Sequence, residues 1–211
     1  MSDADDGNGF FTRALDAEDR GEHAQAETAY RQAIELFEES GPADRELAAC
    51  HYNLGHLYTV MDRTTAAITE YRAALEHFAR LGGSGRHRAR AHLILGSLLL
   101  DTGDLAAAET QLLDALGQYL DAPHEPRDQA ECYVNLARVY RGTRRRAQAV
   151  TAYNRAVDFY EEEPGSCRDR SDCFTELGAL YEETGKLDES AAAFAEAARL
   201  RRAAEQQDGR A

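Results

Sequence analysis

Four arginines recur at a constant spacing of 41 residues, and their chemistry suits recognition of an anionic group. They are Arg45, Arg86, Arg127 and Arg168. A guanidinium group can donate two parallel hydrogen bonds to one carboxylate, so a row of arginines would favour a partner with acidic side chains. Ion pairs with Asp or Glu of a neighbouring repeat explain the same row equally well. The spacing alone leaves both interpretations open.

The other reactive side chains do not form the pattern of a catalytic or metal site. Cys50, Cys132 and Cys173 share one register of the repeat, which is typical of small packing residues, and the sequence has no CxxC pair. His51 and His92 occupy a register that other repeats fill with an aromatic residue. A glycine-rich phosphate loop and a nucleophile elbow are also absent. We therefore expect no enzyme activity, no cofactor and no metal.

The densest basic cluster lies in one expected turn and the helix before it. Its members are Arg138, Arg141, Arg144, Arg145 and Arg146. No aromatic residues alternate with these arginines to stack on bases, and the net charge of −14 repels nucleic acids and anionic membranes on average. We expect a solvated turn here and no nucleic-acid partner.

The sequence also predicts a cytoplasmic location. The first residues, MSDADDGNG, are acidic and polar and do not resemble an export signal. The longest apolar run, near residues 91–100, is too short and too interrupted to cross a bilayer. In that setting the four cysteines are expected to be free thiols in a reducing compartment.

Helices in repeated pairs are the elements that must position these side chains. One small residue returns every 41 residues, at Ala14, Gly55, Gly96, Ala137 and Gly178. Apolar residues around it follow the spacing i, i+3, i+4 and i+7. A second helical stretch after each turn has small residues on either side of a large one, as in Ala67, Tyr71 and Ala74. Small residues let two helices approach closely, and the large ring fills the remaining space.

These motifs resemble the tetratricopeptide repeat family. The L-G-x-x-Y core of that family is matched by Leu54-Gly55-His56-Leu57-Tyr58 and by Leu177-Gly178-Ala179-Leu180-Tyr181. The resemblance implies an all-α protein, a right-handed α-solenoid of five helix-turn-helix hairpins. The repeat of 41 residues is longer than the usual tetratricopeptide length and is similar to the branch found in kinesin light chains, polarity adaptors and bacterial peptide sensors.

The expected domain organisation is one repeat array between two tails. We expect a disordered acidic tail over residues 1–8, a single array over 9–204 and a polar tail over 205–211. The repeats are expected at approximately 9–41, 42–82, 83–123, 124–164 and 165–204. Phe37, Phe78, Tyr119 and Tyr160 share a register whose fifth member is Arg201. We therefore expect the array to stop there, with the Ala-rich face of its last helix partly exposed.

The resemblance further implies a concave groove lined by the first helix of each hairpin. Helical angles counted from the small residue place one stripe of side chains there, and Asn53 and Asn135 match the asparagine with which relatives hold a peptide backbone. The expected peptide-binding residues are Arg45, Tyr52, Asn53, His56, Arg86, Arg90, Leu93, Ser97, Arg127, Val134, Asn135, Arg138, Arg141 and Arg168. Asp172 and Glu131 lie on the same stripe.

The function expected from these features is that of a non-catalytic adaptor or scaffold. It would bind a segment of another protein, with the arginines favouring an acidic one, in the concave groove. One alternative is a homo-oligomeric scaffold that assembles through the groove or the terminal helix. A second alternative is a peptide-sensing regulatory module that acts in trans.

Overall fold

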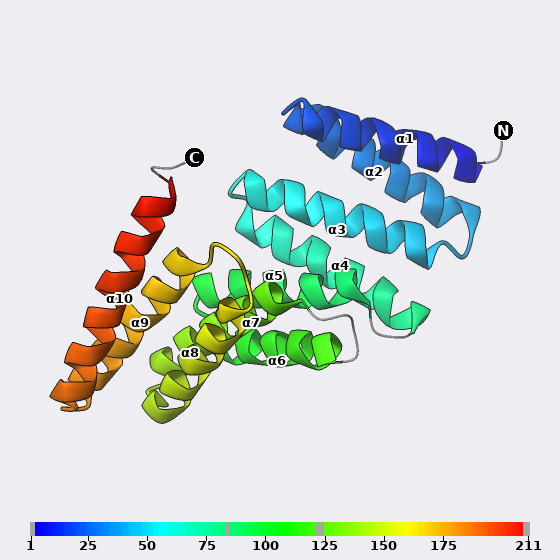
Figure 1. The fold of residues 1–211 in the computed structure, drawn as a ribbon. Helices are drawn as coiled ribbons and strands as arrows, with labels where there is room; N and C mark the ends of the chain where they lie inside the picture. The colour runs from blue at the N-terminus through cyan, green and yellow to red at the C-terminus, as the bar shows by residue number, and fades with distance from the viewer. Residues whose placement is uncertain (1–2, 83–84, 121–124, 209–211) are drawn as a thin grey trace. The chain divides into compact units, whose positions relative to one another are not determined.

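A computed structural model describes residues 3–82, 85–120 and 125–208 and contains ten α-helices and no strand in those ranges. They are arranged as five consecutive helix-turn-helix pairs (Figure 1). The helices are α1 (Asp3–Asp19), α2 (His23–Ser40), α3 (Asp44–Val60), α4 (Thr64–Leu81), α5 (Arg86–Asp101), α6 (Leu105–Leu120), α7 (Pro126–Gly142), α8 (Arg146–Glu161), α9 (Cys167–Glu183) and α10 (Leu187–Asp208). The predicted all-α fold of five hairpins is confirmed.

The chain divides into two compact units, and the division falls within α5. The first unit is residues 1–98 and the second is residues 99–211. In the first unit, α1 packs on α2, α3 packs on α4, and the two hairpins meet through α2 and α3. In the second unit, α7 packs on α8 and α9 on α10, while α6 contacts α7 and α8 contacts α9. Each unit therefore stacks its hairpins in chain order.

The tight turn within each hairpin depends on one residue with a left-handed backbone. That residue recurs every 41 positions, at Gly21, Asp62, Gly103, Arg144 and Gly185, and its φ ranges from 56° to 85°. Glycine adopts such a φ without steric cost, whereas a side chain makes it unfavourable. Asp62 and Arg144 nevertheless adopt the same conformation, with φ of 56° and 61°. The turn geometry is therefore imposed by the packing of the two helices as well as by the local sequence.

The core is built on the predicted register of small and large residues. In the second helix of each hairpin, Ala26, Ala67, Ala108 and Ala149 are fully buried, as are Tyr30, Tyr71 and Leu112 one turn later. The ring of Tyr71 lies only 3.2 Å from the position that a Cβ would take on Gly55. Ser190 replaces the alanine in the last hairpin, and its buried hydroxyl donates a hydrogen bond to the carbonyl of Gly178 at 2.9 Å.

The two expected tails are shorter in the structure than predicted. Residues 3–8, expected to be disordered, form the first turns of α1, and α10 continues to Asp208. At the amino-terminal end, Gly7 lies directly against the ring of Phe37 on α2. An acidic residue such as Asp6 also suits the positive end of the helix dipole. At the other end, Ala204 is 5% exposed and extends the packed face of α10. Residues 1–2 and 209–211 lie outside the described ranges.

Candidate functional site: a groove between α7 and α9

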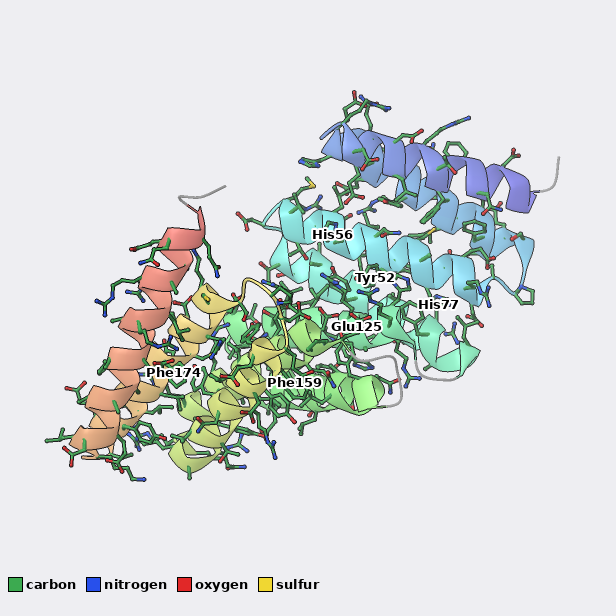
Figure 2. All side chains as sticks on the ribbon, in the orientation of Figure 1. Tyr52, His56, His77, Glu125, Phe159 and Phe174 are labelled. Atoms are coloured by element: carbon green, nitrogen blue, oxygen red, sulfur yellow. The ribbon has the colours of Figure 1, made fainter. Side chains whose placement is uncertain are left out.

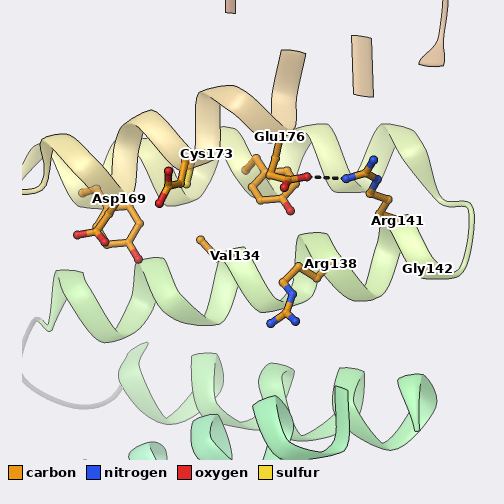
Figure 3. Close-up of a pocket in the computed structure, with 10 residues that line it drawn as sticks. Val134, Arg138, Arg141, Gly142, Asp169, Cys173 and Glu176 are labelled. Atoms are coloured by element: carbon orange, nitrogen blue, oxygen red, sulfur yellow. Dashed lines mark hydrogen bonds and ion pairs between the residues drawn. The ribbon is translucent and has the colours of Figure 1, made fainter. Parts of the chain in front are cut away.

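The clearest groove in the second unit lies between the first helices of its last two hairpins. It has a volume of about 530 Å³ (Figure 3). Tyr153 and Tyr160 of α8 form its floor together with Cys173. The groove, called here the α7–α9 groove, is lined by Val134, Arg138, Arg141, Gly142, Tyr153, Tyr160, Asp169, Asp172, Cys173 and Glu176. Three of the residues predicted from sequence, Val134, Arg138 and Arg141, are therefore brought together here.

The arginines of this groove are already paired with carboxylates. Arg141 donates to Glu176 at 2.5 Å and to Glu183 at 2.8 Å, and Figure 3 shows the first of these bonds as a dashed line between the two side chains. The hydrogen bond to Glu183 is the main reason that the pKa of Arg141 is raised. Arg138 donates to Asp101 at 3.1 Å and to the side-chain oxygen of Asn135 at 3.2 Å. These contacts fix the guanidinium groups before any partner binds.

Among the four recurring arginines, Arg127 shows most clearly which groups such a side chain contacts. Its guanidinium donates to Asp169 of the next hairpin at 3.3 Å and lies 3.7 Å from Glu131 of its own helix. This contact agrees with the interpretation of the row as ion pairs between repeats. Arg168 is exposed and lines an adjoining polar cavity with Arg201 and Glu205, and Asp172 lines both this cavity and the α7–α9 groove. The row therefore does not form one continuous cationic edge within the second unit.

The residues predicted in the first unit have varied surroundings. Tyr52 makes edge-to-face contacts with Tyr71 and His87 at ring-centroid distances of 5.7 and 5.9 Å, and His56 is paired with Glu18 at 2.9 Å (Figure 2). Arg45 lines a small cavity beside Phe11 and Phe37 of the first hairpin. Arg86 and Arg90 are exposed, and Asn53 and Ser97 are half-buried.

Leu93 does not fit the predicted groove. Its side chain is only 4% exposed, so it is a core residue with little surface for a ligand. Its position on the stripe was inferred from helical angle alone, and helical angle does not tell which neighbouring helix covers a given side chain.

Sequence reasoning did not assign six residues of the α7–α9 groove to a binding site: Gly142, Tyr153, Tyr160, Asp169, Cys173 and Glu176. Tyr153 and Tyr160 were assigned to the core because their register is aromatic in most repeats, although one edge of each ring also lines the groove. Asp169 was not placed on the stripe, and Glu176 occupies the register of Asn53 and Asn135 at the edge of the stripe. The arginine spacing held a usable signal, because a carboxylate follows Arg127 by 42 residues and is its partner in the structure.

A second polar arrangement joins neighbouring hairpins on the side of the turns. Arg145 donates to both oxygens of Glu109 on α6, at 2.8 and 2.5 Å, and lies 4.5 Å from the ring centroid of Tyr140. The first unit repeats the arrangement with Arg63, Tyr58 and Glu27 on α2, where Arg63 donates to Glu27 at 2.7 Å. We call each set of Glu, Tyr and Arg a junction clamp. The clamps account for the positions of Arg63 and Arg145 without a bound ligand.

The clamp at Glu109 should contribute stability that depends on pH. Hydrogen bonding from Arg145 lowers the pKa of Glu109 below its ordinary value of 4.5. A carboxyl group whose pKa is depressed in the folded state stabilises the fold above its unfolded pKa, and that contribution is lost as the pH falls through the folded pKa. We expect Glu109→Gln to reduce the free energy of unfolding by about 1 kcal/mol at neutral pH. The deficit relative to wild type should shrink once the pH falls below 4.5.

Urea denaturation followed by circular dichroism at several pH values measures this deficit. Glu189→Gln is the matched control, because Glu189 is exposed on α10 and has no ion pair within the described ranges. A deficit for Glu109→Gln that stays constant into the acid range would show that the carboxylate charge is not the source of the stabilisation.

The cysteines show no sign of a shared site. All four are free thiols, and Cys50, Cys132 and Cys173 are buried. Burial raises the pKa of Cys50 and of Cys173 to about 12, so their thiols stay protonated and unreactive at neutral pH. In the described ranges, no group of three or more His, Cys, Asp or Glu side chains is placed to hold a metal ion. The described helices also include none with the length and apolar character needed to cross a membrane.

Paired helices, a recurring small residue and a groove between first helices define a helical-repeat protein of the tetratricopeptide type. A family model described as the tetratricopeptide repeat matches residues 47–121 and 128–203, and another model with the same description matches residues 11–57. The chain therefore belongs to the tetratricopeptide repeat family. A comparison with curated proteins finds no match.

Solved structures share the fold at low sequence identity. BtubC from P. vanneervenii has a TM-score of 0.78 at 24% identity, over 90% of this chain and 77% of the other. YrrB, described as a TPR protein with an unusual peptide-binding site, has a TM-score of 0.69 at 17% identity, covering 90% and 84%. A Rap protein in complex with competence and sporulation factor has a TM-score of 0.64 at 19% identity, covering 94% of this chain and 54% of its own. The chain thus spans about half of that Rap protein.

Proposed function

We propose that this protein is a non-catalytic interaction module that holds a segment of a partner protein in the α7–α9 groove. The observation that carries the proposal is the groove itself, with a volume of about 530 Å³, an aromatic floor and charged walls. That volume lies within the usual range for ligand sites, roughly 300–1,000 Å³. The described peptide-binding site of YrrB supports a groove of this kind as a peptide site, and the Rap protein in complex with competence and sporulation factor shows that a similar fold binds a partner.

The charges of the groove favour a basic side chain on the bound segment. Two arginines and three carboxylates line it, and both arginines are committed to ion pairs. Among the described residues, Asp172 has no ion-pair or hydrogen-bond partner, and its side chain is exposed. A lysine or arginine of the partner could pair with Asp172, while an apolar neighbour packs on Tyr153 and Val134. We therefore replace the acidic partner expected from the arginine row with a segment that carries at least one cation.

The four cysteines support a reducing location for this interaction. None of them is in a disulfide, and three are buried as thiols. Disulfides are rare in reducing compartments, where such thiols persist. We propose the cytoplasm as the setting of the interaction.

Selection from a phage-displayed library of random peptides provides a direct test. We expect enriched peptides to share a lysine or arginine next to an apolar residue. Asp172→Asn should then weaken the binding of an enriched peptide roughly tenfold, which corresponds to the loss of one charge-assisted hydrogen bond. Fluorescence anisotropy with the labelled peptide measures the affinity.

Asp114→Asn is the matched control for this test. It removes the same charge from an exposed position on α6, outside the groove, and should leave the affinity unchanged. Equal affinities for the two variants, or a selection without enrichment, would contradict the proposal.

A further inference from the structure

The last helix exposes an apolar face that its counterparts in other hairpins bury. Phe194 of α10 is 39% exposed, whereas Tyr30, Tyr71 and Tyr153 at the same register are at most 2% exposed. Leu187 at the start of α10 is 67% exposed. The other second helices bury this register partly under the hairpin that follows, and no further hairpin follows α10 within the described residues (Figure 1).

The exposed apolar residues lie along one side of α10. Leu187, Ala191, Phe194 and Ala198 follow one another at intervals of four, three and four residues, which places them on a single helical stripe. The exposed Arg201, three residues after Ala198, ends the apolar part of this stripe. Ala195 lies beside this stripe and is also exposed. Phe194 packs part of its ring against Gly178 of α9 and leaves the rest exposed, whereas Ala193, Ala197 and Leu200 are buried. We call the exposed side, from Leu187 to Arg202, the α10 face.

Two opposite charges flank the α10 face symmetrically. Asp188 lies seven residues before Ala195 and Arg202 lies seven residues after it. Both side chains are exposed, and neither has an ion-pair partner within the described ranges. They are about 21 Å apart along the helix, at 1.5 Å for each residue. Because the charges are opposite and equidistant from Ala195, the face is complementary to itself when turned by a half-rotation.

We propose that the α10 face is a self-association surface on which a second copy of this chain docks its own α10. The two helices run antiparallel and cross near Ala195, so that Asp188 of each copy lies opposite Arg202 of the other. Leu187 and Phe194 supply apolar contact area, and the exposed alanines let the helices approach closely. Such a contact uses the same surface on both copies and therefore closes at the dimer.

The first hairpin has a cavity of about 560 Å³, but Arg13 and Arg20 line it together with Gln25 and Gln32, so it is less apolar than the α10 face. In α3, three leucines, Leu47, Leu54 and Leu57, are at most 6% exposed. The same registers in α1 carry Asp6, Arg13 and Asp16. An apolar α10 face packed against these charges would bury them without partners, which is unfavourable. The occupant that fits the α10 face is therefore another α10 face.

Sedimentation equilibrium of the full chain over a concentration series tests this proposal. Wild type should show a monomer–dimer equilibrium. Asp188→Arg and Arg202→Asp should each raise the dissociation constant roughly tenfold, because by symmetry each variant replaces two attractive pairs with two repulsive ones. Asp114→Arg, a reversal on the exposed surface of α6, should leave the constant unchanged.

Combining the two charge reversals in one chain distinguishes the antiparallel α10 contact from other modes of association. The double variant Asp188→Arg/Arg202→Asp should regain wild-type dimerisation, because the charges are exchanged and not lost. An equimolar mixture of the two single variants should form heterodimers for the same reason. A wild type that stays monomeric at all concentrations, or a double variant no better than the single ones, would overturn the proposal. Peptide binding in the α7–α9 groove stands or fails independently, since no residue of the α10 face lines it.

Discussion

Tyr153→Ala is expected to lower the free energy of unfolding of the second unit by about 3–5 kcal/mol. Tyr153 is 2% exposed and belongs to a buried cluster with Ala137, Cys173 and Leu177. It therefore contacts residues of α7 and α9 as well as its own helix. Truncation to alanine would leave a cavity where α7, α8 and α9 meet, and the loss includes both the buried ring area and the unfilled volume.

Tyr153→Phe separates packing from polar effects at the same position. The described residues around the Tyr153 hydroxyl act on it through burial and charge and not through a hydrogen bond, so its removal should change the unfolding free energy by less than about 1 kcal/mol. Urea denaturation followed by far-ultraviolet circular dichroism compares both variants with wild type. A Tyr153→Ala protein as stable as wild type would show that the ring does not support the contact between hairpins.

Gly55→Leu is expected to destabilise the first unit by about 3 kcal/mol, near the upper end of the usual cost of overpacking. A Cβ at residue 55 would lie 3.2 Å from two ring atoms of Tyr71, and that ring is fully buried. A leucine must place three further carbon atoms in the same region. The ring cannot retreat, so α3 and α4 would have to separate.

Gly55→Ala is the control that tests whether close packing against Tyr71 causes the loss of stability. The same register holds Ala14 and Ala137 in two other hairpins, where both alanines are fully buried. A single methyl group is thus compatible with the hairpin after small shifts, and alanine favours the helix by about 1 kcal/mol over glycine. We expect a net change close to zero, measured by thermal and urea denaturation. A leucine variant as stable as the alanine variant would contradict the close-packing argument.

The fold could be predicted from sequence because its determinants recur. A small residue at Gly55 has little meaning alone, but the same type at five positions with one spacing specifies where two helices approach. Turn residues recur with the same spacing, and Gly21, Gly103 and Gly185 adopt a left-handed backbone in the structure. Helix ends were harder to predict, because residues 3–8 are polar and are held in α1 by packing of Gly7 on Phe37, which is a tertiary contact.

The site was predicted less well because charge pairing is a property of neighbours in space. Helical angle placed Arg138 and Arg141 on one stripe, and both line the α7–α9 groove. It could not show that Glu176 and Glu183, on the next first helix, pair with Arg141. It also placed Leu93 on the groove stripe although another element covers it. The charge proposed for the bound segment differs from the sequence expectation for the same reason. Arginines that recur at one spacing are easy to see in the sequence, whereas the carboxylates that pair with them are not.

The junction clamps make the hairpins unequal as building blocks, although their backbones repeat. In the second helices, the position of the clamp glutamate is occupied by Glu27, Ile68, Glu109 and Val150. The position of the clamp arginine, 36 residues later, is occupied by Arg63, Asp104, Arg145 and Lys186. A chain shortened by residues 42–82 would bring Glu27 opposite Asp104, which sets two carboxylates together. A chain shortened by residues 42–123 would bring Glu27 opposite Arg145 and restore a clamp. In recombination or design, the interchangeable module is therefore a tandem of two hairpins, 82 residues long.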